Sequence, residues 1–246
     1  MNIALIGYGR MGHAIEKIAL SRGHKIVLTI DKGEDDKFKS PIWKEVDAAI
    51  EFTGPSSAES NCRQILNMGI PLVCGSTGFM TPELMSEFMA LCKKGATFFY
   101  ATNFSVGVNI LFALNQRLAS LMTHQDEYKA QVEETHHIHK LDKPSGTAVT
   151  LLSDLIKFNH RYKDWSLVDN TDNDFNKLSI DTIPVKAYRE GEVFGIHQVS
   201  YTSSVDTISI RHEAFSRDGF ATGAVLAAEY TRDNNGLLTM ADLLGI

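Results

Sequence analysis

Three side chains in the stretch 134–148, ETHHIHKLDKPSGTA, have the types and spacing needed to transfer protons to an acidic substrate. His136 and Lys140 are four residues apart, and His137 is displaced from both, so all three can line one small pocket. We predict that this cluster supplies cationic proton donors and an anion ligand to an acidic substrate.

The turn that follows this cluster predicts an anion-binding helix start. Gly146 and Thr147 begin a segment with apolar residues at helical spacing, namely Ala148, Leu151, Leu152, Leu155 and Ile156. The first backbone N–H groups of a helix have no intrahelical partners and favour a carboxylate or a phosphate. Cationic groups beside such a start indicate an acidic substrate.

Two other interpretations of the cluster stay open at this point. Neutral imidazoles ligate zinc, but no cysteine lies near His136, His137 and His139, and the order H-H-x-H matches no closed zinc site. The cluster can also be an exposed polar loop with solvated side chains. We predict no metal.

A second motif, at the start of the chain, predicts a dinucleotide site. The apolar strand 2–6 runs directly into GYGRMG, residues 7–12, and a helical pattern and a second strand, 25–30, follow. The glycines would let a pyrophosphate approach the helix start, and Asp31 after the second strand would bind the ribose hydroxyls. The Lys32 ammonium can bind the 2′-phosphate of NADPH, or Lys32 can be a solvated surface lysine. The expected cofactor is therefore NADH, NADPH or both. The alternative is an ordinary strand-to-helix turn with Asp31 as a cap.

Strand and helix patterns alternate through the first hundred residues, which predicts a parallel sheet. Further strands are expected at 47–53, 71–74 and 97–101, with helices ending near Met68 and spanning 82–93. The loops 75–78 and 102–105 emerge from carboxyl ends of strands, where such sheets bind ligands, so we expect them to flank the nicotinamide.

The pattern changes in the second half of the chain. A helix is expected over 108–122, then strands at 128–135, 183–188, 195–202 and 207–213, and a last helix at 220–230. The last three strands have short connections, which predicts an antiparallel meander in an α+β domain. The polar stretch 163–177 is expected to be a loop.

Composition restricts the class of protein. The chain has 246 residues, 43% of them hydrophobic, and a net charge of −6, which argues against a general nucleic-acid binder. Cys62, Cys74 and Cys92 are odd in number and contain no C-x-x-C pair, which favours a reducing compartment. The first apolar run is too short for a membrane anchor, so we expect a cytoplasmic protein.

Five segments of the sequence resemble the 4-hydroxy-tetrahydrodipicolinate reductase family of bacterial lysine and diaminopimelate biosynthesis. They are GYGRMG, CGSTGF, ATNFSVGVN, HHIHKLDKPSGTA and HEAFSRDGFATGAV, in the order that the family has. The resemblance spans nearly the whole chain. The pattern HH-x-x-K-x-D-x-PSGTA is specific to that family, whereas many dehydrogenases share the N-terminal glycines.

The resemblance implies a Rossmann-like doubly wound parallel sheet plus a second α+β domain with an open mixed sheet. Residues 1–107 and 217–246 would form the dinucleotide-binding domain, and 108–216 the substrate-binding and tetramerisation domain. The activity would be NAD(P)H-dependent reduction of 4-hydroxy-tetrahydrodipicolinate to tetrahydrodipicolinate, a small cyclic dicarboxylate, by a homotetramer.

The resemblance also implies residue roles. His136 would be the general acid/base and Lys140 the proton donor, with the substrate held by His137, Ser145, Gly146, Thr147 and Arg217. The cofactor would be held by Gly7, Tyr8, Gly9, Arg10, Met11, Gly12, Asp31, Lys32, Gly75, Ser76, Thr77, Ala101, Thr102, Asn103 and Phe104.

Some residues depart from the family pattern. Lys143 stands where alanine is usual, Lys32 replaces a frequent arginine and lacks its bidentate fork, and the connection 32–46 is short. Two alternatives for the function remain: another amino-acid-pathway dehydrogenase, such as an aspartate-semialdehyde or homoserine dehydrogenase, and a non-catalytic dinucleotide-sensing regulator. The first of these dehydrogenases needs a catalytic cysteine motif that the chain lacks, and a regulator would have degraded proton donors.

Overall fold

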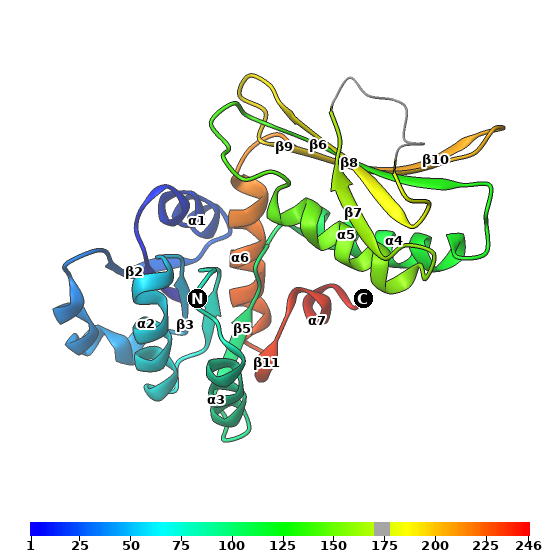
Figure 1. Ribbon diagram of the computed structural model, residues 1–246. Helices are drawn as coiled ribbons and strands as arrows, with labels where there is room; N and C mark the ends of the chain where they lie inside the picture. Colours follow the sequence, from blue (N-terminus) through cyan, green and yellow to red (C-terminus); the bar gives the residue numbers. More distant parts are fainter. Residues whose placement is uncertain (170–177) are drawn as a thin grey trace. The chain divides into compact units, whose positions relative to one another are not determined.

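The computed structural model describes residues 1–169 and 178–246 (Figure 1). The chain forms two compact units. The first unit comprises Met1–Val106 and Arg217–Ile246, and the second comprises Gly107–Ser216.

The first unit contains a six-stranded sheet in the order β11-β5-β4-β3-β1-β2, with every neighbouring pair parallel. Its strands are β1 (Asn2–Ile6), β2 (Lys25–Ile30), β3 (Ala48–Glu51), β4 (Leu72–Cys74), β5 (Thr97–Tyr100) and β11 (Gly236–Leu238). The central strands are short apolar runs that are buried on both faces, as is typical of parallel sheets. The sheet is therefore the predicted doubly wound type.

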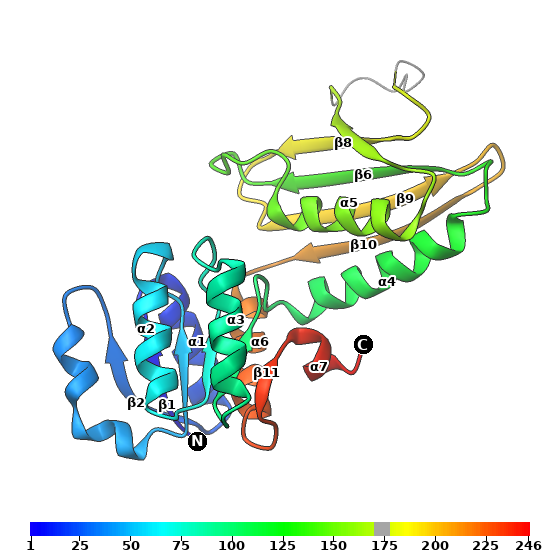
Figure 2. The same ribbon diagram turned by 60° about the horizontal axis from the view of Figure 1, so that its bottom comes forward.

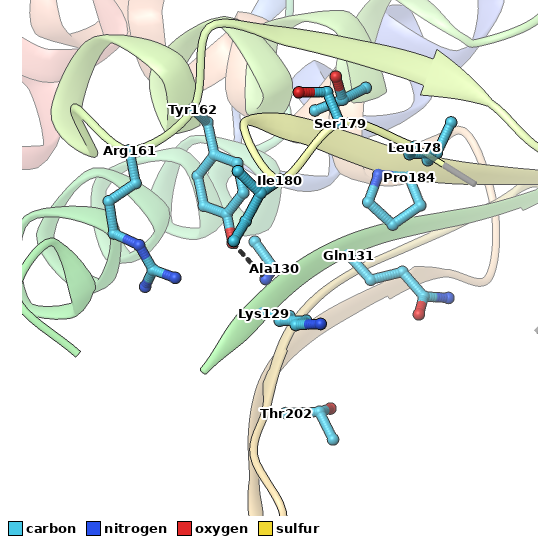
Figure 3. Close-up of a pocket in the computed structure, with 11 residues that line it drawn as sticks. Lys129, Ala130, Gln131, Arg161, Tyr162, Leu178, Ser179, Ile180, Pro184 and Thr202 are labelled. Atoms are coloured by element: carbon cyan, nitrogen blue, oxygen red, sulfur yellow. Dashed lines mark hydrogen bonds between the residues drawn. The ribbon is translucent and has the colours of Figure 1, made fainter. Parts of the chain in front are cut away.

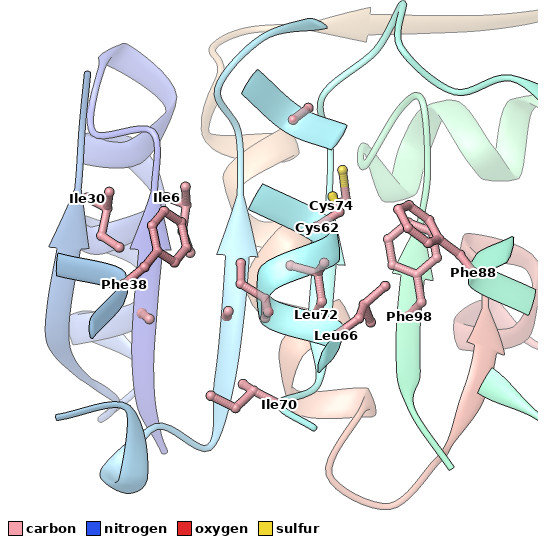
Figure 4. Close-up of a cluster of buried hydrophobic side chains, with 14 of the residues drawn as sticks. Ile6, Ile30, Phe38, Cys62, Leu66, Ile70, Leu72, Cys74, Phe88 and Phe98 are labelled. Carbon is pink, nitrogen blue, oxygen red and sulfur yellow. The ribbon is translucent and has the colours of Figure 1, made fainter. Parts of the chain in front are cut away.

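Helices cover both faces of this sheet. One face packs on α1 (Arg10–Ser21) and α6 (Asp218–Tyr230), and the other packs on α2 (Pro55–Asn67) and α3 (Pro82–Cys92). Alternate residues of β1 show the division, because Ile3 and Leu5 belong to the first cluster and Ala4 and Ile6 to the second. Figure 4 shows the second cluster, in which Cys62 and Cys74 lie next to each other.

The connection 32–46, which the family resemblance marks as short, contains two 3₁₀ helices, Asp35–Lys39 and Pro41–Glu45. Phe38 and Trp43 from these helices stack in the α2/α3 cluster, with 5.8 Å between ring centroids. A short terminal helix, α7 (Met240–Leu244), follows β11.

The second unit has a five-stranded mixed sheet in the order β10-β9-β6-β8-β7. The elements are α4 (Val106–Met122), β6 (Lys129–His136), α5 (Gly146–Phe158), β7 (Asp164–Leu167), β8 (Thr182–Arg189), β9 (Gly195–Thr202) and β10 (Thr207–Ala214). Figure 2 shows α4 and α5 on one face of the sheet. Val132, Val185 and Val199, which are paired across β6, β8 and β9, pack with α5 residues such as Leu151.

The predicted antiparallel meander is wrong in one respect. β9 and β10 are an antiparallel hairpin, but β8 and β9 are not neighbours, because β6 lies between them, parallel to β8 and antiparallel to β9. The short connection between β8 and β9, residues 190–194, passes around the end of β6. There, Glu190 N–H donates to His136 O (2.8 Å), and His137 N–H donates to Val193 O (2.7 Å). A short connection therefore did not require adjacent strands here.

The predicted loop over 163–177 is also partly wrong. β7 pairs in parallel with β8, and Trp165 packs against the core of the second unit. The remainder of that prediction, residues 170–177, lies outside the described residues. Within 1–169 and 178–246, no helix has the length and apolar character needed to cross a lipid bilayer.

Candidate active site

The predicted glycine motif forms the junction between β1 and α1. Gly7 has φ 91°, and a Cβ built on it would lie 2.3 Å from the Phe52 carbonyl oxygen; a Cβ on Gly12 would lie 2.4 Å from Gly7 O. Both positions therefore require glycine for packing. Gly9 has open space where its Cβ would lie, and as N-cap of α1 it supplies no side-chain cap. Its neighbouring amides are thus available to a pyrophosphate, and the junction fits a dinucleotide.

A cleft of ≈ 520 Å³ opens beside this junction at the carboxyl ends of β1, β2 and β3. Four predicted cofactor residues line it: Gly7, Gly9, Asp31 and Lys32. Ten lining residues were not predicted: Ile6, Ile30, Gly33, Asp35, Phe52, Thr53, Gly54, Ser56, Ser57 and Asn61. The segment 52–57 follows β3, the strand next to β1, so the same argument from strand ends could have identified it.

A buried carboxylate holds that segment. Glu51, at the end of β3, is fully buried, and its Oε1 accepts from the Thr53 amide (3.1 Å), the Thr53 hydroxyl and Asn61 Nδ2 (3.4 Å). Its Oε2 accepts from the Cys74 thiol (3.3 Å), and the hydrogen bond with Cys62 together with burial raises the pKa of Cys74 well above its usual range. The Cys74 thiol is therefore a buried packing group rather than a nucleophile.

The other predicted cofactor residues lie at β1, β4 and β5. A Cβ on Gly75 would lie 2.1 Å from the Phe52 ring, and the buried Ser76 hydroxyl has no partner among the described residues. Asn103 Oδ1 accepts from the Ser105 amide (2.9 Å). Phe104 is buried, and its ring packs against the rings of Phe52 and Phe99.

The remaining members of the predicted cofactor set lie in α1 and in the loops after β1, β4 and β5. The Tyr8 hydroxyl donates to Glu16, and Arg10 and Met11 begin α1. Thr77 and Thr102 are exposed, and Ala101 is half-buried.

The histidine cluster lies at the end of β6, in the second unit. His136 is the last residue of the strand and is 6% exposed, and its Nδ1 lies 3.6 Å from Glu134 Oε2. The neighbouring strand β9 brings His197 beside it, with 5.0 Å between ring centroids. His197 belongs to no motif of the sequence, and the pairing of Glu134 with His197 across β6 and β9 brings it there.

The loop after β6 holds Lys140. Its ammonium lies 2.8 Å from Asp142 Oδ1, and its amide donates to His137 O (3.1 Å). His139 points to the exposed Glu192 carboxylate (3.6 Å). The three histidines named in the metal alternative therefore do not form one ligand set.

The helix α5 starts at Gly146, the predicted residue. Ser145 is the N-cap: its hydroxyl accepts from the Ala148 amide (3.3 Å), and its own amide donates to Glu134 Oε2 (2.9 Å). Gly146 and Thr147 are the first helical residues, where amides lack intrahelical acceptors. His197 Nε2 lies 3.1 Å from Ser145 Oγ, so β9 and α5 meet at this hydroxyl.

The prediction that His136 is cationic is wrong for the unliganded protein. Burial lowers the pKa of His136 to about 4. The Glu134 carboxylate raises this pKa, whereas the positive charges of Lys140 and Arg189 lower it. Burial, with smaller effects of His136, His212 and Lys140, lowers the pKa of His197 to about 3. Both imidazoles are neutral at pH 7, because desolvation disfavours their charged forms more than Glu134 favours them.

Glu134, His136 and His197 could also be considered as metal ligands, since their ligand atoms lie within 4.8 Å of one another. However, Glu134 already accepts from Arg189 Nη2 (3.0 Å) through one oxygen and from the Ser145 amide through the other. These contacts make the Glu134 carboxylate part of a hydrogen-bonded network in which Arg189 is the cation.

Arg217, another predicted substrate ligand, is the N-cap residue of α6 in the first unit, whereas His136 and Lys140 belong to the second unit. Its contribution to substrate binding stays a prediction.

A separate pocket of ≈ 430 Å³ lies at the other end of β6 (Figure 3). Lys129 and Ala130 line it, together with Arg161 and Tyr162, whose hydroxyl accepts from the Ala130 amide (2.7 Å). Lys129 and His136 are the first and last residues of β6, about 23 Å apart in an extended strand. This pocket is therefore distinct from the histidine site.

Comparisons with known proteins identify the family of the chain. The family domain described as "Dihydrodipicolinate reductase, N-terminus" matches residues 1–104, and "Dihydrodipicolinate reductase, C-terminus" matches residues 107–244. The chain is 45% identical over 245 residues to a 4-hydroxy-tetrahydrodipicolinate reductase of Christiangramia forsetii, covering 99% of this chain and 98% of the relative. It is 32% identical to the enzyme of that name from Staphylococcus epidermidis, covering 99% and 100%.

Solved structures share the fold. A dipicolinate-bound dihydrodipicolinate reductase from Paenisporosarcina sp. TG-14 superposes with a TM-score of 0.75 at 18% identity, covering 98% of each chain. An amine dehydrogenase from Mycobacterium smegmatis has the same fold at lower similarity, with a TM-score of 0.61 at 13% identity over 98% and 95% of the two chains. The two family domains together span almost all of the sequence, and the chain belongs to the dihydrodipicolinate reductase family.

Proposed function

We propose that this chain catalyses the reaction of its family, the NAD(P)H-dependent reduction of 4-hydroxy-tetrahydrodipicolinate to tetrahydrodipicolinate in lysine and diaminopimelate biosynthesis. The observation that carries the proposal is the convergence, in the second unit, of the His136 end of β6, the Lys140 loop and the Ser145-capped start of α5. A proton source and an anion-binding helix start in one place suit a cyclic dicarboxylate.

The substrate carboxylates would bind at the start of α5. The amides of Gly146 and Thr147 and the Ser145 hydroxyl supply donors there, with His137 and Arg217 as further ligands. If His197 donates through Nε2, Ser145 Oγ accepts from His197 and Ala148, and its own proton remains for the substrate.

Lys140 would supply the proton. The ammonium is held by Asp142 in the unliganded protein, and a substrate anion would compete for it. His136, neutral at pH 7, would orient the substrate through a hydrogen bond, and a bound dicarboxylate would raise its pKa towards the range of a general acid.

The cofactor would be held by the junction between β1 and α1, by Asp31 and Lys32, and by the loops 75–77 and 101–104. The bound nicotinamide would supply hydride to an electrophilic carbon of the substrate. The glycine contacts and the uncapped start of α1 support this assignment, as does the place of Asp31 in the lining of the cleft.

The test is a coupled assay with the purified protein and a synthase that makes 4-hydroxy-tetrahydrodipicolinate. We expect oxidation of NADH or NADPH only when the synthase and its substrates are present, and competitive inhibition by dipicolinate. Lys140→Ala and His136→Gln should each lower kcat by about 100-fold or more, since each removes a group that acts on a proton.

Lys143→Ala is the matched control, because Lys143 is an exposed lysine of the same loop. It should keep kcat within about threefold, the effect of a surface charge. Normal turnover in Lys140→Ala and His136→Gln would contradict the residue roles, and absence of turnover in the unmodified protein would contradict the function.

We also propose a cytoplasmic homotetramer. The sheet of the second unit has a polar face opposite α4 and α5, with Gln131, Glu133 and Gln198 half-buried there, and such a face can pack on a second copy. The family resemblance supports the tetramer, and unpaired Cys62 and Cys74 are consistent with a reducing compartment. Sedimentation velocity should give a mass four times that of the chain; a monomer would contradict the assembly.

A further inference from the structure

A buried ion pair lies beneath the proposed proton-transfer loop. The Glu134 side chain is fully buried, that of Arg189 is 10% exposed, and Arg189 Nη2 donates to Glu134 Oε1 (3.0 Å). The pair follows from the sheet register, because Arg189, at the end of β8, lies opposite His136, two residues beyond Glu134. Neither residue has a role in the proposed reaction.

The two members of the pair hold different parts of the loop. The Arg189 guanidinium donates through Nε to Lys140 O (3.1 Å) and through Nη2 to Asp142 O, so it contacts the backbone of both Lys140 and its ion partner. Glu134 Oε2 accepts from the Ser145 amide, where α5 begins. The loop between β6 and α5 is therefore attached to one buried pair near its middle and at its end.

We propose that Arg189 and Glu134 are positioning residues that hold the loop 137–145 in the geometry needed for proton delivery and anion binding. This inference rests on the proposed function. Only a planar guanidinium can reach Glu134, Lys140 O and Asp142 O together, because its N–H donors diverge in one plane. A lysine would keep the charge and lose the simultaneous contacts.

The chain offers a matched control at the opposite end of the sheet. The Arg161 side chain is 20% exposed, and its guanidinium donates to three backbone carbonyls, those of Gln125 (2.6 Å), Tyr128 (3.1 Å) and Asp126 (3.1 Å). Arg161 thus forms hydrogen bonds with the backbone of the loop that precedes β6, as Arg189 does with the loop that follows β6. Arg189→Lys and Arg161→Lys are thus the same chemical change in two equivalent settings.

The first measurement is amide hydrogen exchange on the full chain, which does not depend on activity. Arg189→Lys should speed exchange in 137–145 by about 10-fold or more and leave 125–128 unchanged, and Arg161→Lys should do the reverse. Glu134→Gln removes the charge that pairs with Arg189 and should speed exchange at the Ser145 amide. Unchanged exchange in 137–145 for Arg189→Lys would overturn the proposal.

The second measurement is steady-state kinetics of the same variants in the coupled assay. Arg189→Lys should lower kcat by about 10- to 100-fold, as expected from a displacement near 1 Å, while KM for the nicotinamide cofactor changes less than about twofold. Arg161→Lys should keep kcat within about twofold even where its Tm falls. A common loss of kcat in both variants, proportional to the loss of Tm, would show a merely structural role and overturn the proposal. If the unmodified protein is inactive while exchange responds as expected, the proposed function fails and the positioning of the loop stands.

Discussion

At the scale of single residues, the site combines neutral imidazoles with nearby cations. His136 and His197 are buried and uncharged at pH 7, and the positive charge comes from Lys140 and Arg189. Ion pairs with Asp142 and Glu134 compensate these cations in the unliganded protein. In the proposed mechanism, a dicarboxylate would therefore have to replace Asp142 as the ion partner of Lys140.

His197 should make the protein less stable in acid. Its pKa is about 3 in the folded protein against an ordinary value of 6.5, so between these values the unfolded chain binds a proton that the native protein does not. Stability must fall as the pH falls through this window, by about 2 kcal/mol at pH 5 from this residue. Urea unfolding from pH 7 to 4.5 should show a smaller decrease for His197→Gln than for the parent protein. An identical pH dependence would show that the pKa of His197 is the same in the folded and the unfolded protein.

Asp31 and Lys32 should set the cofactor preference. Both line the cleft after β2, and a carboxylate suits ribose hydroxyls whereas an ammonium suits a 2′-phosphate. Lys32→Ala should lower kcat/KM for NADPH by about threefold to fivefold and leave the value for NADH within about twofold. Equal losses with the two cofactors would place Lys32 away from the 2′ position.

At the scale of elements, the βα junctions and helix starts were predictable from local sequence. The strand at Lys25–Ile30 and the start of α5 at Gly146 match the predicted residues, because apolar periodicity and glycine or serine caps act within a few residues. The order β9-β6-β8 was not predictable, since it depends on how the connection 190–194 passes the end of β6.

Two glycines of the same motif should respond differently to alanine. Gly7→Ala places a Cβ against Phe52 O at a left-handed φ and should destabilise the protein by about 2 kcal/mol or more. Gly9 has φ −85° and open space, so Gly9→Ala should keep the Tm but raise the Kd for NAD(P)H about 10-fold, because Gly9 lines the cleft. Thermal unfolding and fluorescence titration separate the two effects. A Tm loss of equal size in both variants would contradict the assignment of Gly9 to cofactor binding.

At the scale of the whole molecule, the two units carry different candidate sites. The cofactor cleft is built from residues of the first unit, and the cluster around His136, Lys140 and Ser145 from residues of the second. Each ligand should therefore find most of its contacts within one unit.

Binding of the two ligands should accordingly be separable by mutation. In calorimetric titrations, Lys140→Ala should raise the Kd for dipicolinate about 10-fold or more, because a charged donor to a carboxylate is lost, and leave the Kd for NADH within about twofold. Gly9→Ala should give the opposite pattern. If Lys140→Ala weakened both ligands equally, the sites would not be independent.

The sequence by itself determined the local elements, the dinucleotide junction and the stretch from His136 to Thr147, because strand and helix periods, glycine conformations and caps depend on neighbouring residues. Tertiary structure alone decided that Arg189 and His197 join Glu134. Those contacts join strands far apart in the chain, and their register depends on packing summed over a whole sheet. Burial, likewise a tertiary property, decided that His136 is neutral where its sequence neighbours suggested a cation.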